Sequence, residues 1–193
     1  MEPMKTEEAA GEAQVIRPRV ATVWLAGCSG CHMSFLDLDE RLIDLASRID
    51  LVFSPIADRK TFPEDVALTL VEGAVANEEN LHFLRTVRKN SKVLVAFGDC
   101  AVTGNVTAIR NSLGTALPVL DRAYRDARLL NPRIPESDGI VPRLLDRVRP
   151  LHEIVKVDTW LPGCPPGPDL IHKLLLEALA GNVPSFAGLA SFG

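Results

Sequence analysis

This 193-residue sequence lacks three features that would place it in a broad class at once. It has no surplus of basic charge, since 25 acidic residues outnumber 21 basic ones, and this argues against a nucleic-acid partner. It has no apolar run near the roughly 18 residues that span a bilayer. Its first residues are too polar and acidic for a signal peptide. We therefore expect a cytoplasmic protein without a membrane partner.

Nucleotide-binding motifs are also absent. Neither GxGxxG nor the phosphate loop GxxxxGK followed by Ser or Thr occurs, so a glycine-rich nucleotide cradle is not expected. A flavin mononucleotide site would need serine, threonine and glycine in the loop after the first strand. This loop offers cysteines instead.

Cysteine itself is scarce, and the chain has four: Cys28, Cys31, Cys100 and Cys164. Thiols in the cytoplasm are usually kept reduced. We therefore interpret the four residues as ligands or reactive thiols rather than as structural disulfides.

The residues that are present predict one compact domain, since 47% of them are hydrophobic. Short valine-rich runs predict strands at residues 20–25, 51–53, 66–71, 93–97 and 154–160. Helical spacing or capping signals predict helices at residues 31–48, 77–90 and 168–180. Apolar strands alternating with helices indicate a parallel sheet that is covered on both faces. We expect an α/β fold, a three-layer flavodoxin-like domain over residues 20–181.

Three segments do not follow this alternation. We expect residues 1–19 to form a tail that is mobile or docked on a partner. We expect residues 182–193 to form an apolar C-terminal tail that docks on another chain or on its own domain. Residues 111–152 form a long insertion with five prolines and a short helix predicted at 123–130. An insertion of this length usually has a functional role or faces a partner.

The four cysteines follow three predicted strands: Cys28 and Cys31 the first, Cys100 the fourth and Cys164 the fifth. Because the carboxyl ends of parallel strands share one edge of a sheet, we expect the thiols to converge there. Four converging thiolates bind a tetrahedral metal ion or an iron-sulfur cluster.

Glycines beside the cysteines let the loops approach a bulky group closely: Gly27, Gly30, Gly98 and Gly163. The isolated positions of two cysteines, together with a large core, favour an iron-sulfur cluster over a structural zinc ion. At this point zinc, thiol chemistry and ordinary core cysteines remain open.

Three polar residues near these loops are further candidates. His32 is a candidate hydrogen-bond donor to a cluster sulfur, and otherwise a partly exposed residue at a helix start. Glu72, at the end of the third strand, is a candidate proton relay, and otherwise a partner of the turn backbone. Asp99 is expected to order its own loop.

Four motifs together resemble the small subunit of nickel-iron hydrogenases: GCSGCHMSFLD, LVEGAV, AFGDCAVTGN and LPGCPPGPD. The resemblance covers residues 20 to about 181, and the length is most similar to the small subunit of cytoplasmic NAD-reducing hydrogenases. It implies that Cys28, Cys31, Cys100 and Cys164 hold one 4Fe-4S cluster and that Glu72 lies near it. The cysteine- and histidine-rich region that holds two further clusters in membrane-bound and periplasmic relatives has no counterpart here.

By this resemblance, the chain is an electron-transfer subunit of a hetero-oligomer. The nickel-iron centre lies in a separate large subunit, and FMN, NAD and further clusters lie in diaphorase subunits. Two alternatives remain: a zinc-stabilised interaction module, and the homologous small subunit of a complex I-like quinone oxidoreductase. The latter subunit has two adjacent cysteines where this chain has Cys28 and Cys31 separated by two residues.

Overall fold

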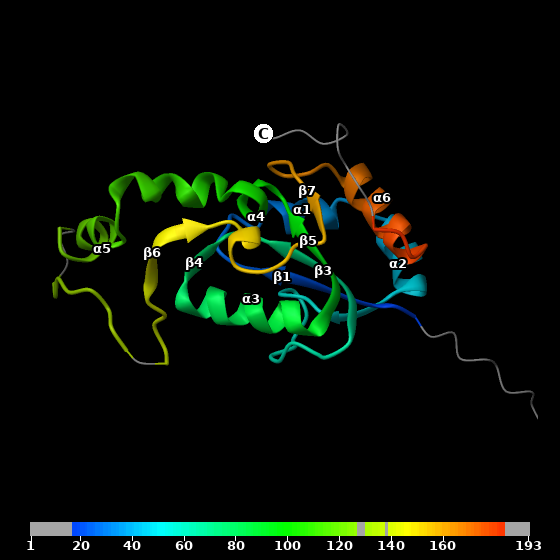
Figure 1. Cartoon of the computed structure of the whole chain (residues 1–193), viewed down its shortest axis with the longest axis horizontal. Coiled ribbons are helices and arrows are strands. Elements are labelled where there is room, and N and C mark those ends of the chain that lie inside the picture. The colour runs from blue at the N-terminus through cyan, green and yellow to red at the C-terminus, as the bar shows by residue number, and fades with distance from the viewer. Residues whose placement is uncertain (1–16, 127–129, 138, 184–193) are drawn as a thin grey trace, which may run out of the picture.

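A five-stranded sheet forms the centre of the protein, which was analysed as a computed structural model that describes residues 17–126, 130–137 and 139–183. The strand order is β2-β1-β3-β5-β7, and every neighbouring pair is parallel (Figure 1). The strands are β1 Arg19–Trp24, β2 Asp50–Phe53, β3 Val66–Glu72, β5 Ser91–Phe97 and β7 Thr159–Leu161. The predicted parallel α/β sheet is therefore confirmed.

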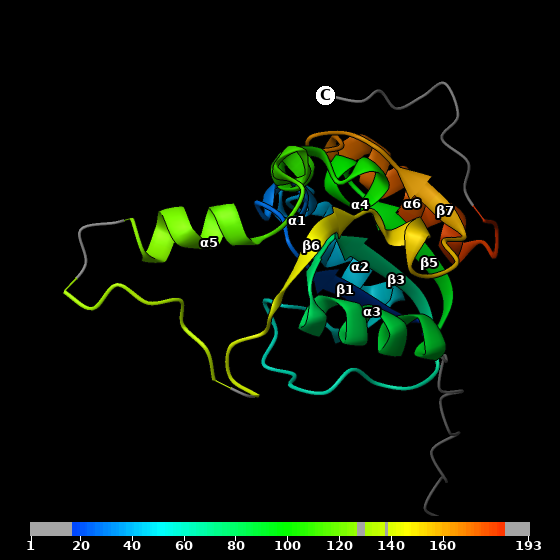
Figure 2. The same cartoon turned by 60° about the vertical axis from the view of Figure 1, so that its left-hand side comes forward.

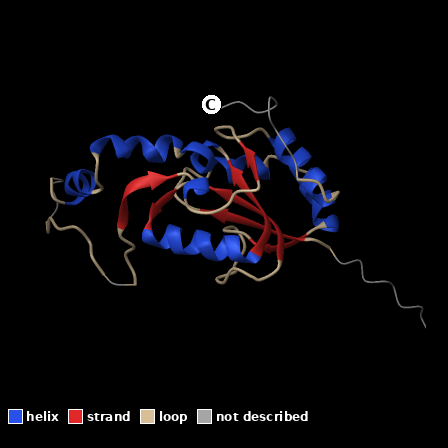
Figure 3. Cartoon of the chain, viewed as in Figure 1, coloured by secondary structure: helices blue, strands red, loops and turns tan. Residues whose placement is uncertain are grey.

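Helices cover both faces of the sheet (Figure 3). On one face, α1 Gly30–Leu36, α2 Arg41–Arg48 and α6 Pro168–Leu179 bury apolar side chains against the strands; on the other face, α3 Glu78–Asn90 and α4 Asp99–Thr103 do the same. Residues along β5 alternate between the two clusters, with Val95 and Phe97 in one and Leu94 and Ala96 in the other. This alternation fits a strand that is buried on both faces.

Capping residues account for the helix boundaries that the sequence predicted correctly. Asn77 caps α3, because its side chain accepts a hydrogen bond from the Asn80 amide at 2.7 Å. Pro168 lies in the first turn of α6, where its missing N–H is not needed, and Gly181 follows the helix with φ +82°.

Two predicted elements have different bounds. The helix predicted at 31–48 is interrupted between α1 and α2, where Asp39 adopts φ +49° and the buried Leu38 anchors the turn. The strand predicted at 154–160 is reduced to β7, and a 3-10 helix, η2 Leu151–Glu153, precedes it. Ile154 and Val155 pack against the cluster around α3 instead of extending the strand.

The insertion contains more regular structure than the sequence predicted. A 3-10 helix, η1 Asn105–Leu113, leads to α5 Leu117–Tyr124, and β6 Leu144–Arg149 pairs antiparallel with β4 Val75–Asn77. The short helix therefore begins six residues before the prediction, at Leu117, and Pro118 lies in its first turn. Figure 2 shows α5 and the loop after it standing out from the body.

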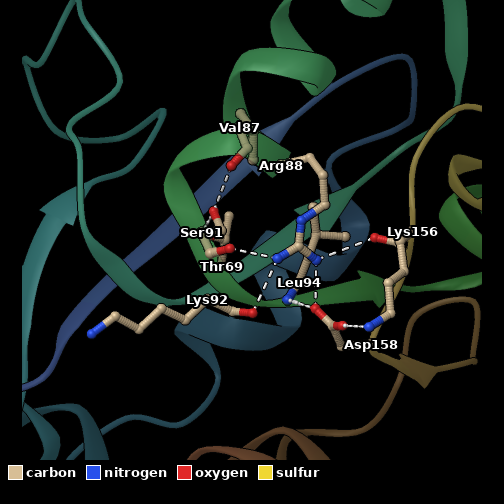
Figure 4. Close-up of polar contacts among 8 residues, drawn as sticks. All are labelled: Thr69, Val87, Arg88, Ser91, Lys92, Leu94, Lys156 and Asp158. Carbon is tan, nitrogen blue, oxygen red and sulfur yellow. Dashed lines mark hydrogen bonds and ion pairs between the residues drawn. The ribbon is translucent and has the colours of Figure 1, made fainter.

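Arg88 joins the end of α3 to the sheet (Figure 4). Its guanidinium donates to the carbonyls of Ser91 and Lys156 and to the Asp158 carboxylate, which also accepts the Leu94 amide at 2.9 Å. Burial alone would raise the pKa of Asp158, but the hydrogen bonds from Arg88 and Leu94 and the Arg88 charge lower the pKa below its ordinary value. The network fixes the start of β7, which leads to Cys164.

Neither tail can be compared with its prediction in full, because residues 1–16 and 184–193 lie outside the described part of the chain. Among the described helices, none has the length and apolar character needed to cross a bilayer.

Candidate functional site

The four cysteines lie where three strands of the sheet end. Cys28 and Cys31 follow β1, with Cys31 in α1; Cys100 follows β5 in α4; and Cys164 follows β7. Cys31 and Cys100 are buried, whereas Cys28 and Cys164 are exposed, and all four are free thiols. The carboxyl edge of a parallel sheet is where α/β folds place their ligand sites.

The thiols lie within electrostatic reach of one another. Burial raises the pKa of Cys31 most, followed by the charges of Glu72, Cys100, Cys28 and Cys164. Burial likewise raises the pKa of Cys100, with further increases from Cys28, Cys164 and Glu72 and an opposing hydrogen bond from the Thr107 backbone. Ionisation of the Cys31 and Cys100 thiols is therefore disfavoured unless a positive charge lies beside them, and a bound metal would meet that condition.

Gly98 leaves room for the Cys31 thiol. It adopts φ +84°, and a Cβ built on it would collide with the Cys31 Sγ. Its amide donates to the Leu161 carbonyl at 2.8 Å. The ends of β5 and β7 and the start of α1 thus meet at one position, which only glycine can occupy without displacing the thiol.

Two hydrogen bonds tie the Cys100 loop to the Cys164 loop. The Asp99 amide donates to the Gly163 carbonyl at 3.0 Å, and the Gly163 amide donates to the Asp99 carboxylate at 2.6 Å. Asp99 therefore binds the neighbouring loop through both its amide and its carboxylate, whereas the sequence predicted a role in its own loop.

The other two predicted glycines lie at the Cys28–Cys31 loop. A Cβ on Gly27 would lie 3.3 Å from the Gly73 Cα and 3.7 Å from Glu72 Oε1, and a Cβ on Gly30 would lie 3.2 Å from the Cys28 Sγ. Both positions are therefore tight, and Gly27 brings this loop against the end of β3.

His32 and Glu72 form a buried pair, with 1% and 3% of their surfaces exposed. The Glu72 Oε2 accepts the His32 backbone amide at 3.0 Å and contacts the ring Nδ1. The rings of Trp24 and Phe97 meet the imidazole edge-on. The His32 Nε2 has no hydrogen-bond partner in the described chain. The alternative of a partly exposed His32 is therefore wrong, and Glu72 holds α1 rather than its own turn.

Two polar residues of this edge were not predicted from the sequence. The Asn105 Nδ2 donates to the Cys164 Sγ at 3.4 Å, and the Ser34 hydroxyl donates to the Pro166 carbonyl at 2.6 Å. The position of Asn105 directly after Gly104, in a loop that follows a cysteine, was the available signal. Ser34 gave none, because its partner is 132 residues away.

The donor set suits either a metal ion or an iron-sulfur core. Zinc bound by thiolates at about 2.3 Å requires sulfur atoms roughly 3.8 Å apart. Within the described ranges, no three Cys, His, Asp or Glu side chains form such a compact group. The four free thiols at this edge are also the donors that an iron-sulfur core takes, and Gly98 keeps space open beside the Cys31 Sγ.

Comparison with known proteins gives a consistent result. The family described as NADH ubiquinone oxidoreductase, 20 Kd subunit, matches residues 28–178. The NAD-reducing hydrogenase HoxS subunit delta of Cupriavidus necator is 41% identical over 170 residues, which cover 85% of this chain and 79% of that subunit. One subunit of the F420-non-reducing hydrogenase vhu of Methanocaldococcus jannaschii is 36% identical, and the match covers 86% of this chain but 57% of that protein.

Solved structures also include a hydrogenase chain that is similar to this one. The structure titled NAD+-reducing [NiFe]-hydrogenase in the H2-reduced state contains a chain with a TM-score of 0.82 and 43% identity, and the match covers 88% of this chain and 94% of that one. A [NiFeSe] hydrogenase from Desulfovibrio vulgaris Hildenborough has a TM-score of 0.54 and 18% identity over 88% of this chain and 62% of its own, and it supports the fold alone.

Proposed function

Since this chain belongs to the family of the NADH ubiquinone oxidoreductase 20 Kd subunit and, within it, to the nickel-iron hydrogenase small subunits of the NAD-reducing type, we propose that it transfers electrons within such a hydrogenase. When bound, a 4Fe-4S cluster supplies one-electron transfer between the nickel-iron site of the large subunit and a flavin- and NAD-binding diaphorase module. The complex is a hetero-oligomer, and we place it in the cytoplasm.

The four cysteine sulfurs would hold the cluster. The observation that carries this proposal is the arrangement of free thiols at three strand ends, with Gly98 open beside the Cys31 Sγ. Two of the thiols come from buried positions and two from exposed ones. This places the site at the surface, where a partner subunit can approach it within electron-transfer distance.

The surrounding residues orient these sulfurs. Asp99 ties the Cys100 and Cys164 loops together, Asn105 donates to the Cys164 Sγ, and Ser34 joins α1 to the loop after Cys164. Backbone amides near Gly27 and Gly30 would be the donors to cluster sulfur, and hydrogen bonds of this kind help set the redox potential. The amides of Gly98 and Gly163 are already bonded to the Leu161 carbonyl and the Asp99 carboxylate, so these two glycines would serve the site by leaving space.

His32 and Glu72 would act beside the cluster. The ring Nε2, which has no partner in the described chain, is the atom that His32 would offer to sulfur. As a proton relay, Glu72 would take up a proton at Oε1, because Oε2 is already bonded to His32 and Oε1 lies beside Gly27. A Glu72→Gln variant, which retains an acceptor oxygen, should slow proton exchange between hydrogen and deuterated water; an unchanged rate would refute the relay.

Replacement of Cys100 tests the proposal. In the native complex, Cys100→Ala should lose the electron paramagnetic resonance signal of this cluster and uncouple hydrogen oxidation from NAD reduction by at least about 100-fold, since one of four cluster ligands is gone. Ser47→Ala is the control, because its exposed hydroxyl bonds only a carbonyl of its own helix, away from the cysteine edge. Full coupling in the Cys100 variant would contradict the assignment.

The quinone-reductase subunit is a second candidate, because the matching family carries that description. It predicts membrane subunits and no nickel in the purified complex. Nickel in a complex that contains this chain would exclude it.

A further inference from the structure

The insertion projects from the domain as an arm, defined here by η1, α5, the loop residues 130–137 and 139–143, and β6. Figures 1 and 2 show α5 and the following loop away from the sheet and its covering helices in both views. Hydrogen bonds and strand pairing fix the root of the arm to the domain.

Side chains of η1 hold the root in place. Arg110 donates to the carbonyls of Ala76 and Leu145 at 3.1 and 2.7 Å. Asn111 exchanges two hydrogen bonds with the Val148 backbone, at 2.8 and 2.7 Å. Together with the pairing of β4 and β6, these contacts give the arm a set direction.

The arm exposes a concentration of apolar side chains. Half of the sixteen large exposed hydrophobic residues in the described chain belong to it, although it is about a quarter of that chain: Val106, Ile109, Leu113, Leu117, Tyr124, Leu130, Ile140 and Val141. Ile109 is 69% exposed and Ile140 79%. A concentration of exposed apolar side chains in one segment is a feature of contact surfaces.

The charge of the arm is opposite to that of the rest of the chain. Residues 105–149 contain eight arginines, no lysine and five carboxylates, a surplus of three positive charges in a chain of net charge −4, so the remainder carries −7. Arginine is enriched in protein interfaces and lysine is depleted, because the guanidinium bonds carboxylates in a fixed fork and is weakly hydrated.

The arm is also continuous with the cysteine edge. Gly104 ends α4, which carries Cys100, and η1 begins at the next residue. That residue, Asn105, contacts Cys164, and the exposed Val106 and Ile109 follow it on η1. A partner that covers the cysteines therefore meets the arm as well.

We propose that the arm is a clasp for the hydrogenase large subunit and that it docks on an apolar surface of that subunit bordered by carboxylates. This inference rests on the proposed function, which brings the large subunit to the cysteine edge. The apolar side chains supply buried area, and the exposed Arg122, Arg133 and Arg143 supply the charge attraction. The clasp would hold the cluster site of this chain and the nickel-iron site of the large subunit at a fixed distance from each other.

The test uses the native complex with Arg122→Glu, Arg133→Glu and Arg143→Glu in this chain. None of the three side chains bonds another residue of the described chain, so the fold is preserved. The complex is captured through this chain, and the large subunit that is retained is measured at rising salt concentrations. We expect the variant to retain less large subunit than wild type at low salt, with affinity weakened by about tenfold or more, and the difference to shrink as rising salt screens the charges.

A matched variant, Arg48→Glu, Arg59→Glu and Arg85→Glu, makes the same change of charge at exposed positions outside the arm and should behave as wild type. A second variant, Ile109→Ser with Ile140→Ser, should weaken retention at all salt concentrations. Equal retention in the arm variants and wild type would overturn the clasp, as would selective loss of diaphorase subunits or of a second copy of this chain. If wild type itself binds no large subunit, the proposed function fails instead.

Discussion

At the scale of single residues, Gly98 shows how the backbone conformation at one position determines where the Cys31 sulfur can lie. A φ of +84° disfavours any residue that has a Cβ, and the Cys31 Sγ occupies the space that a Cβ would need. Glycine therefore fits this position for two separate reasons. Gly114 has almost the same φ, +81°, but a Cβ there would meet no atom within 4 Å. The two glycines therefore separate backbone strain from displacement of the thiol.

We predict that Gly98→Ala and Gly114→Ala each cost about 1–2 kcal/mol of stability, because alanine is strained at positive φ. In addition, Gly98→Ala should displace the Cys31 sulfur and lower the iron content of this chain to less than about half. Metal analysis and thermal unfolding of the purified complex measure the two effects. Equal iron content in both variants would show that the contact at Gly98 has no part in the site.

The four cysteines, their glycines and Asp99 could be predicted from the sequence, because each is adjacent to a strand end and carries a distinctive chemistry. Asn105 and Ser34 could not be predicted with the same reasoning. Their roles depend on partners brought close by the fold, the Cys164 sulfur and the Pro166 carbonyl. The burial of His32 was missed for the same reason, since Trp24, Phe97 and Glu72 cover it from three other positions in the chain.

At the scale of elements, the Arg88 network connects α3, β5 and the segment before β7. The Asp158 carboxylate accepts hydrogen bonds from Arg88 and from the Leu94 amide, and its pKa in the folded protein lies below the ordinary value of 3.8. Its contribution to stability is therefore complete above about pH 4 and is lost as the pH falls through the lower, folded-state pKa.

We predict that Asp158→Asn weakens the protection of the Leu94 amide by about 1.5–3 kcal/mol at neutral pH, as expected for lost hydrogen bonds to a charged group. The difference between variant and wild type should shrink as the pH falls below 4, where wild-type Asp158 also becomes neutral. Hydrogen exchange of the β5 peptide, measured for both proteins at each pH, checks this. A difference that stays constant down to pH 2 would contradict the role of the ionised carboxylate.

Strands and amphipathic helices were predictable because their apolar periodicity repeats over several residues. The break at Asp39, the shortened β7 and the pairing of β6 with β4 depend on single backbone conformations and on distant segments, which periodicity does not record. The start of α5 was predicted six residues too late, although Pro118 in its first turn is a residue typical of helix starts.

At the scale of the whole molecule, the parallel sheet performs the essential step of bringing distant thiols to one edge. Cys28 and Cys164 are far apart in the chain, yet β1, β3, β5 and β7 lie in sequence across the sheet and end at the same side. The arm begins from that edge, so the domain presents its four cysteines and its proposed partner surface together. The family relationship and the site geometry therefore support the same account.

Anomalous scattering at the iron absorption edge, from crystals of the native complex, tests the central claim most directly. The account predicts one strong iron peak within bonding distance of the sulfur atoms of Cys28, Cys31, Cys100 and Cys164. A peak that appears only at the zinc edge, or any of these four sulfurs directed away from the metal, would contradict it.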